Sequence, residues 1–154
     1  MLLEESAPTE FFAEEISEGD QHIWGVAASD HLGQQVWEAM VLLIALRHWS
    51  WKWRGKRIAL TIRSDNITAL TLVSKLKAGG PALAKIGREL ALGFASAEYA
   101  PDFIEHTPGV MNKTPDILSR KFEPNANFKI PLVLSAATET KPARRAASWW
   151  KALK

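Results

Sequence analysis

Cysteine is absent from the 154 residues, which excludes disulfide bonds, thiolate metal sites and cysteine nucleophiles. The sequence also lacks an apolar run long enough to cross a bilayer, and its longest run, residues 40–46, suits a buried helix better. The first residues have neither the positive start nor the apolar stretch of a signal peptide. We therefore expect no membrane span, and a reducing compartment is compatible with the composition.

Basic residues are missing from the N-terminal part of the chain, and acidic residues are scarce in its C-terminal part. Residues 1–38 contain nine acids and no lysine or arginine, whereas residues 120–154 contain eight bases and two acids. The basic end could hold phosphates by releasing counterions, or it could be a solvated and partly disordered tail. Because 47% of the residues are apolar, one core can form. We expect one domain over residues 1–121 and a basic tail containing Pro and Ala over residues 122–154.

The spacing of apolar residues predicts an α/β domain. The expected helices cover residues 34–49, 67–77 and 83–98, and a last helix follows an N-cap at Thr114 with Pro115 in its first position. The expected strands cover residues 57–63 and 103–106, with shorter pieces at 2–3, 11–13 and 23–27. Residues 6–9 and 17–20 are expected to be connections. This order predicts a mixed sheet flanked by helices.

Three carboxylates and one histidine stand where chemistry could use them. Glu38 lies in an otherwise apolar helix, Asp65 ends a strand, Asp116 opens the last helix, and His106 ends the strand before it. Carboxylates that converge on one sheet edge suit hard cations such as Mg²⁺. Taken singly, each has a structural explanation: a solvent-facing or paired acid, a helix cap, a charge at a helix start, or a loop histidine.

Three segments share a pattern in their order and spacing. They are residues 38–46 (EAMVLLIAL), 63–70 (RSDNITAL) and 106–120 (HTPGVMNKTPDILSR). The last segment resembles the ending H-x-P-G-x-x-N-x-x-A-D-x-L-S-R, with Pro115 in place of the usual Ala. Together the segments resemble the ribonuclease H domain of eukaryotic retrotransposon reverse transcriptases, over about residues 1–121.

The resemblance implies a fold and a set of roles. The fold would be ribonuclease H-like, with Glu38, Asp65 and Asp116 binding Mg²⁺ or Mn²⁺ and His106 helping the product to leave. The substrate would be the RNA strand of an RNA–DNA hybrid, held by its backbone and its A-like shape. Residues near this nucleic acid would be Asn66, Asn112, Lys75, Lys77 and Arg120. A retroelement origin would place the protein in the nucleus or cytoplasm.

The sequence departs from the family at its first carboxylate. No segment before Glu38 resembles the Asp-Ala-Ser motif of the family's first strand, and Asp20 and Asp30 lie in polar connections. The chain is therefore expected to be incomplete at its N-terminus and catalytically impaired or inactive. Without that central strand, neighbouring strands would keep unpaired backbone groups that a protein partner could cover.

Two further interpretations stay open beside a retroelement nucleic-acid-binding domain. The first is a reused, non-catalytic structural subunit of a larger assembly, with Trp149 and Trp150 as contact residues. The tail would be disordered in a retroelement remnant and ordered against a partner in a structural subunit. The second is a plain α/β binding module, which the joint match of three motifs disfavours.

Other basic and aromatic residues have two interpretations. Lys75, Lys77, Lys85 and Arg88 flank a Gly-Gly-Pro loop and could touch a nucleic-acid backbone, although a solvated helix surface is the default. Alternating tryptophans could be a platform for stacked bases. Packing in the core or against a partner is the expected use of this group, which comprises Trp49, Trp51 and Trp53.

Overall fold

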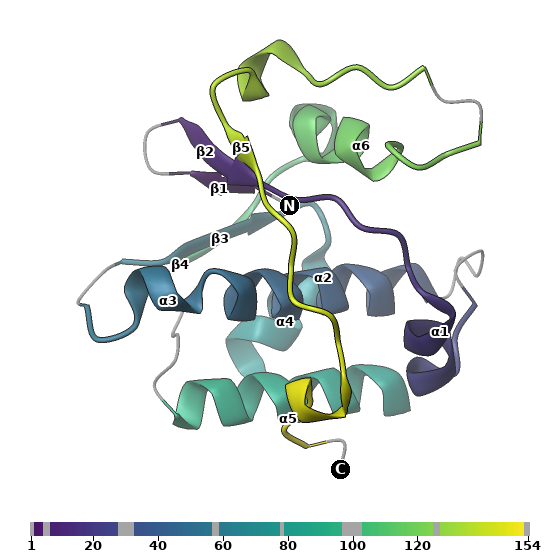
Figure 1. Ribbon diagram of the computed structural model, residues 1–154. Helices are drawn as coiled ribbons and strands as arrows, with labels where there is room; N and C mark the ends of the chain where they lie inside the picture. Colours follow the sequence, from purple (N-terminus) through teal and green to yellow (C-terminus); the bar gives the residue numbers. More distant parts are fainter. Residues whose placement is uncertain are drawn as a thin grey trace. The chain divides into compact units, whose positions relative to one another are not determined.

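The computed structural model describes residues 2–4, 7–27, 33–56, 59–77, 79–96, 103–124 and 127–152 as a mixed α/β protein (Figure 1). The chain forms two compact units whose segments alternate along the sequence. The smaller unit comprises Met1–Glu15 and Pro108–Pro142, and the larger comprises Ile16–Thr107 and Ala143–Lys154. Within the described ranges, no helix is both long enough and apolar enough to cross a membrane.

Three helices form the centre of the larger unit. They are α2 (Gln34–His48), α4 (Ile67–Lys75) and α5 (Pro81–Ala95). Helix α2 packs against both α4 and α5, which also contact each other (Figure 1). Leu43, Ile86 and Leu90 are completely buried. The longest apolar run was expected to form a buried helix, and this is confirmed, because buried residues occupy nearly every position of α2 from Val36 to Leu46.

Two parallel strands complete the larger unit. Strand β3 (Thr61–Ser64) pairs with β4 (Phe103–His106), with Ser64 opposite His106. The pairing continues past the strands, since the Thr107 amide donates to the Ser64 carbonyl at 2.9 Å. Helix α4 contacts both strands. The carboxyl ends of β3 and β4 therefore meet at one edge of this sheet. Residues 57 and 58 of the predicted strand lie outside the described residues.

The first helix, α1 (Glu18–Trp24), corrects the sequence-based expectation. Residues 17–20 were expected to be a connection and residues 23–27 a strand. Instead, Ser17 and Asp20 form a reciprocal capping box that satisfies orphan backbone donors and starts the helix. Gly25 ends it in the left-handed conformation, φ 65°, which costs glycine little. A second short helix, α3 (Ser50–Trp53), follows α2.

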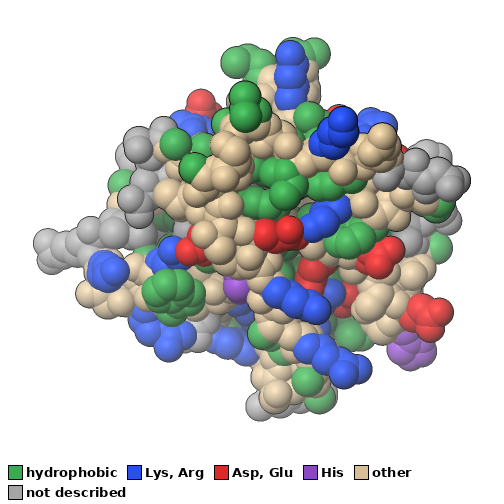
Figure 2. Space-filling view, turned by 45° about the horizontal axis from the view of Figure 1, so that its top comes forward, with side chains coloured by type: hydrophobic (Ala, Val, Ile, Leu, Met, Phe, Trp, Pro, Cys, Tyr) green, Lys and Arg blue, Asp and Glu red, His purple; other side chains and the backbone are tan. Residues whose placement is uncertain are grey.

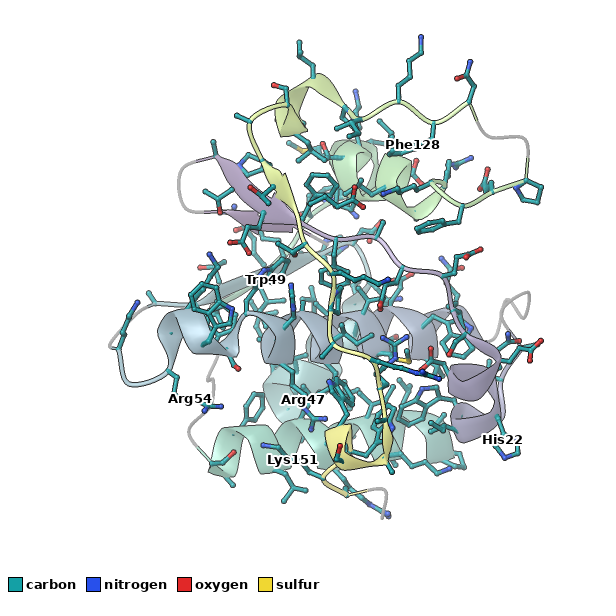
Figure 3. All side chains as sticks on the ribbon, viewed as in Figure 1. His22, Arg47, Trp49, Arg54, Phe128 and Lys151 are labelled. Carbon is teal, nitrogen blue, oxygen red and sulfur yellow. The ribbon has the colours of Figure 1, made fainter. Side chains whose placement is uncertain are left out.

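The C-terminal segment, residues 143–152, is held within the larger unit and contains the short helix η4 (Ala147–Trp149). Trp150 is 3% exposed and meets Trp24 edge to face, with 5.3 Å between ring centroids. Glu89 of α5 accepts hydrogen bonds from the backbone amides of Lys151 and Ala152. Figure 3 shows Arg47 and Lys151 next to one another beside α5. This segment is ordered against its own chain.

The smaller unit contains a three-stranded sheet in the order β1-β2-β5. Strand β1 (Leu2–Glu4) is antiparallel to β2 (Pro8–Phe11), and β5 (Thr138–Glu139) pairs with β2 in parallel. Residues 6–9 were expected to be a connection, but Pro8 is the first residue of β2, where a proline is tolerated. The described strands thus form two sheets, whereas a single mixed sheet was expected.

One further helix and two 3₁₀ turns accompany this sheet. They are α6 (Lys113–Ser119), η2 (Gly109–Met111) and η3 (Leu132–Leu134). Leu118, Leu134 and Phe11 form a buried cluster with Phe128 and Ala137 against it. The predicted N-cap at Thr114 is wrong: α6 begins at Lys113 with Asn112 as its N-cap, and no side chain caps it. Pro115 still fits inside the first turn because the first helical amides need no partner within the helix.

Candidate functional site

Glu38 occupies a half-buried position on α2. Its neighbours in the sequence, Trp37 and Ala39, are buried, so the helix directs this one acid toward a partly dry surface. The side-chain amide of Gln34, one turn earlier, donates to Glu38 Oε1 at 3.1 Å. A half-buried carboxylate in such a place lacks full hydration.

Asp65 and Asn66 follow β3 directly and connect it to α4. Asn66 is the N-cap of α4, and its side-chain oxygen accepts from the Ala69 amide at 2.9 Å. The Asn66 amide in turn donates to Ser64 Oγ at 3.1 Å. This tight turn leaves the Asp65 side chain exposed at the carboxyl end of the strand. The possibility that Asp65 itself caps the helix is therefore wrong, because Asn66 performs that role.

Glu38 and Asp65 are close enough to influence each other's charge. Burial raises the pKa of Glu38 most, and the neighbouring negative charge of Asp65 raises it further. Hydrogen bonds from the side chains of Gln34 and Asn66 act in the opposite direction and only partly offset the increase. The structure therefore brings together Glu38, Asp65 and Asn66, which the sequence pattern had singled out separately.

His106 ends β4 beside the same turn. Its Nε2 atom lies 3.3 Å from the backbone carbonyl oxygen of Asp65, and its ring is exposed. If Nε2 carries the proton of a neutral ring, it donates a hydrogen bond to this oxygen, and Nδ1 is the acceptor nitrogen. His106 and Asp65 thus lie at the same end of this sheet, because β3 and β4 are parallel and Ser64 pairs with His106.

Asp116, Asn112 and Arg120 belong to the smaller unit, apart from this group in the domain division. Asp116 is exposed in the first turn of α6 and forms an ion pair with Arg120 at 3.5 Å. Both side chains are largely exposed to solvent, at 59% and 61%. This i,i+4 pair and the position near a helix start suit a structural role, and such exposed pairs contribute little stability.

The predicted metal ligands belong to different units: Glu38 and Asp65 to the larger one and Asp116 to the smaller one. In the part of the chain that the structure describes, no group of three or more His, Asp or Glu side chains could hold a metal ion. Glu38 and Asp65 nevertheless fit one requirement of Mg²⁺ or Mn²⁺, since neighbouring carboxylate oxygens attract a hard cation. These two residues are the ones that would hold it in the larger unit.

The four basic residues considered for nucleic-acid contact, three lysines and Arg88, have different environments. Lys75 and Lys77 are exposed at the end of α4 and just beyond it. Lys85 donates to the Ile23 carbonyl at 3.2 Å, so part of its bonding capacity joins α5 to α1. Arg88 is exposed on α5. Of these four, Lys75 and Lys77 follow the same helix that Asp65 and Asn66 begin.

Two buried carboxylates escaped the sequence interpretation. Asp20, assigned to a polar connection, is 2% exposed, and Glu89 is completely buried. Burial opposes their ionisation, but hydrogen bonds from Arg145 and Ser17 to Asp20, and from Arg47, Lys151 and Ala152 to Glu89, outweigh it. The pKa of each therefore lies below its ordinary value. The acid on the apolar side of α5 and the Ser17-x-x-Asp20 spacing were the available signals.

Comparison of the chain with protein-family models, with curated proteins and with solved structures finds no match to any of them.

Proposed function

We propose that this chain is a retroelement-derived ribonuclease H-like domain that binds nucleic acid, with an RNA–DNA hybrid as its preferred ligand, and hydrolyses it poorly or not at all. One observation carries the proposal. Glu38, Asp65 and His106 come from a helix and two strands, yet they gather at one sheet edge with Asn66 among them. That set agrees with the resemblance in residue type, order and element.

The chemistry of this edge suits a phosphodiester with a divalent cation. Glu38 and Asp65 repel each other's charge, and Mg²⁺ between them would relieve the repulsion and neutralise a phosphate. When bound, such a cation polarises a phosphoryl oxygen and lowers the pKa of a water. Asn66 holds the turn in place through its cap, and exposed His106 can donate a proton or a hydrogen bond at the edge.

Impaired hydrolysis follows from the sequence. The chain has no counterpart of the carboxylate that the family places in its first strand. Two carboxylates from the larger unit would hold a cation less tightly than a fuller set of oxygen ligands. Binding of the hybrid depends mainly on backbone contacts and shape, so it can persist when hydrolysis is weak.

The test is fluorescence anisotropy with a labelled blunt RNA–DNA hybrid, titrated with and without Mg²⁺. The protein should bind the hybrid more tightly than duplex DNA of the same sequence, and Mg²⁺ should strengthen that binding. Asp65→Asn should remove the effect of Mg²⁺, whereas Glu123→Gln, which alters an exposed acid of the smaller unit, should leave it unchanged. Gel analysis of the same hybrid should show no cleavage above the Asp65→Asn sample.

Two results would overturn parts of this proposal. Equal affinity for hybrid and duplex DNA, without any effect of Mg²⁺ or of Asp65→Asn, would remove the hybrid-binding function. It would then favour a reused structural subunit, for which the smaller unit offers exposed apolar side chains. These include Val110 at 79%, Met111 at 73% and Leu132 at 88% exposure. Cleavage that Asp65→Asn abolishes would show that the domain is a working nuclease.

A further inference from the structure

The tryptophans around α3 differ sharply in exposure. Trp49 and Trp53 are buried, at 2% and 7%, whereas Trp51 between them is 67% exposed. An indole has a large apolar surface, and leaving most of it in water forgoes the stabilisation that burial would give. The two buried rings account for the packing of α3, so the structure leaves the third ring available for another use.

Positive charge surrounds this exposed ring. Residues 39–64 contain six lysines and arginines and no aspartate or glutamate. Arg47 forms an ion pair with Glu89, and Arg63 forms one with Glu105. Lys52, Arg54 and Lys56 follow Trp51 at every second position, and Arg54 and Lys56 are exposed. Figure 3 shows Arg54 beside α3, and Figure 2 shows Lys and Arg side chains at several places on the face it draws, among them its lower left.

Lys52 adds a direct contact with the ring. Its Nζ atom lies 4.8 Å from the centroid of the Trp51 ring, within the range of a cation–π interaction. The ammonium group covers one face of the indole, so a base would stack on the opposite face while the ammonium group meets a phosphate. An aromatic platform with flanking cations is the arrangement by which proteins bind single strands without reading their sequence.

We infer that Trp51, with Lys52, Arg54 and Lys56, binds single-stranded nucleic acid through base stacking and phosphate contacts. The indole would stack on one unpaired base, and the three cations would hold the adjacent backbone. This site is distinct from the sheet edge that contains Glu38. Along α2 alone, Glu38 and the last residue of the helix are roughly 15 Å apart. The inference goes beyond the proposed function and does not depend on hybrid binding at the sheet edge.

The experiment measures anisotropy of a labelled single-stranded oligothymidine and, separately, of a blunt RNA–DNA hybrid. Trp51→Ala should weaken binding of the single strand about tenfold, the loss typical of one stacked base. Trp51→Phe should keep most of the affinity because phenylalanine also stacks. Leu132→Ala, which removes an exposed apolar side chain of the smaller unit, should change nothing. Circular dichroism should show that all variants remain folded.

The flanking charges have their own readout. Replacing Lys52, Arg54 and Lys56 together by Gln should reduce the slope of log affinity against log salt by about two for a single strand. No binding of the single strand by the original chain, or equal binding by Trp51→Ala, would overturn the inference. If the original chain bound the single strand but did not bind the hybrid, only the proposed function would be overturned.

Discussion

Arg145 and Asp20 form a buried, bidentate ion pair between positions 125 residues apart in the sequence. Arg145 Nε donates to Oδ1 at 2.8 Å and Nη2 donates to Oδ2 at 2.7 Å. The two side chains are 10% and 2% exposed. The backbone amide and hydroxyl of Ser17 also donate to Asp20, so this carboxylate both starts α1 and holds the C-terminal segment. A charge this well satisfied becomes costly when one partner is removed.

Arg145→Met should lower the free energy of unfolding by about 3–5 kcal/mol, because Asp20 would remain buried without its cation. Urea denaturation followed by tryptophan fluorescence measures the change. Arg144→Met is the matched control, since Arg144 is the exposed neighbour of Arg145. Its effect should stay within about 0.5 kcal/mol. Similar losses in both variants would mean that the ion pair has no special importance.

Acid should destabilise the larger unit through Asp20 and Glu89. Both pKa values lie below the ordinary values of 3.8 and 4.5, so the folded state binds these protons less tightly than the unfolded state. The stability they contribute is complete above those ordinary values and is lost as the pH falls through the lowered ones. Urea midpoints measured from pH 6 downward should fall, and the fall should be shallower in Asp20→Asn/Arg145→Met. An equally steep fall in the double variant would contradict this assignment.

Glu38 should have the opposite pH dependence. Its raised pKa means that the folded state binds the proton more tightly, so its contribution is most favourable at low pH and is lost as the pH rises through that raised value. Glu38→Gln should therefore raise the melting temperature at pH 7, and the difference should shrink toward pH 4. Glu123→Gln is the control and should show no such trend. A destabilised Glu38→Gln at pH 7 would argue that ionised Glu38 has a stabilising partner.

Trp150 and Trp51 allow a comparison of one residue type in two environments. Trp150→Ala should cost about 3–5 kcal/mol, because it empties a site packed against Trp24. Trp51→Ala should cost less than about 0.5 kcal/mol, since its ring is mostly in solvent. Thermal and urea unfolding of both variants provide the comparison. Tolerance of Trp150→Ala would return this ring to the role of a contact for another protein.

Local signals predicted the elements whose residues decide their own structure. The dense apolar pattern of α2 and the β4 segment between Pro101 and Pro108 are found as expected, with α2 ending at His48. The ends of α4 and α5 differ from expectation by a few residues. In α4, Leu76 takes a left-handed conformation, φ 51°, that the sequence pattern does not encode. The proximity of Glu38 and Asp65 was expected from the resemblance and not from either residue alone.

Long-range contacts account for most of what was missed. The basic residue Arg145 and the aromatic Trp150 have the composition of a solvated tail, and only their partners Asp20 and Trp24 reveal a buried role. Helix α1 was missed because Ile23 and Trp24 also suit a strand, and the capping box at Ser17 decides between the two structures. Asp116 was grouped with Glu38 by resemblance, whereas in the structure its side chain forms an ion pair with Arg120.

The alternation of the two units along the chain has a consequence during synthesis. Residues 16–107 leave the ribosome well before residues 143–152, which supply further partners of Asp20, Glu89 and Trp24. Until then Asp20 lacks its Arg145 cation, Glu89 lacks two of its backbone donors, and the Trp24 ring lacks the cover of Trp150. Completion of the larger unit must therefore wait for residues 143–152, and a nascent chain stalled before residue 143 should be a good substrate for chaperones and proteases.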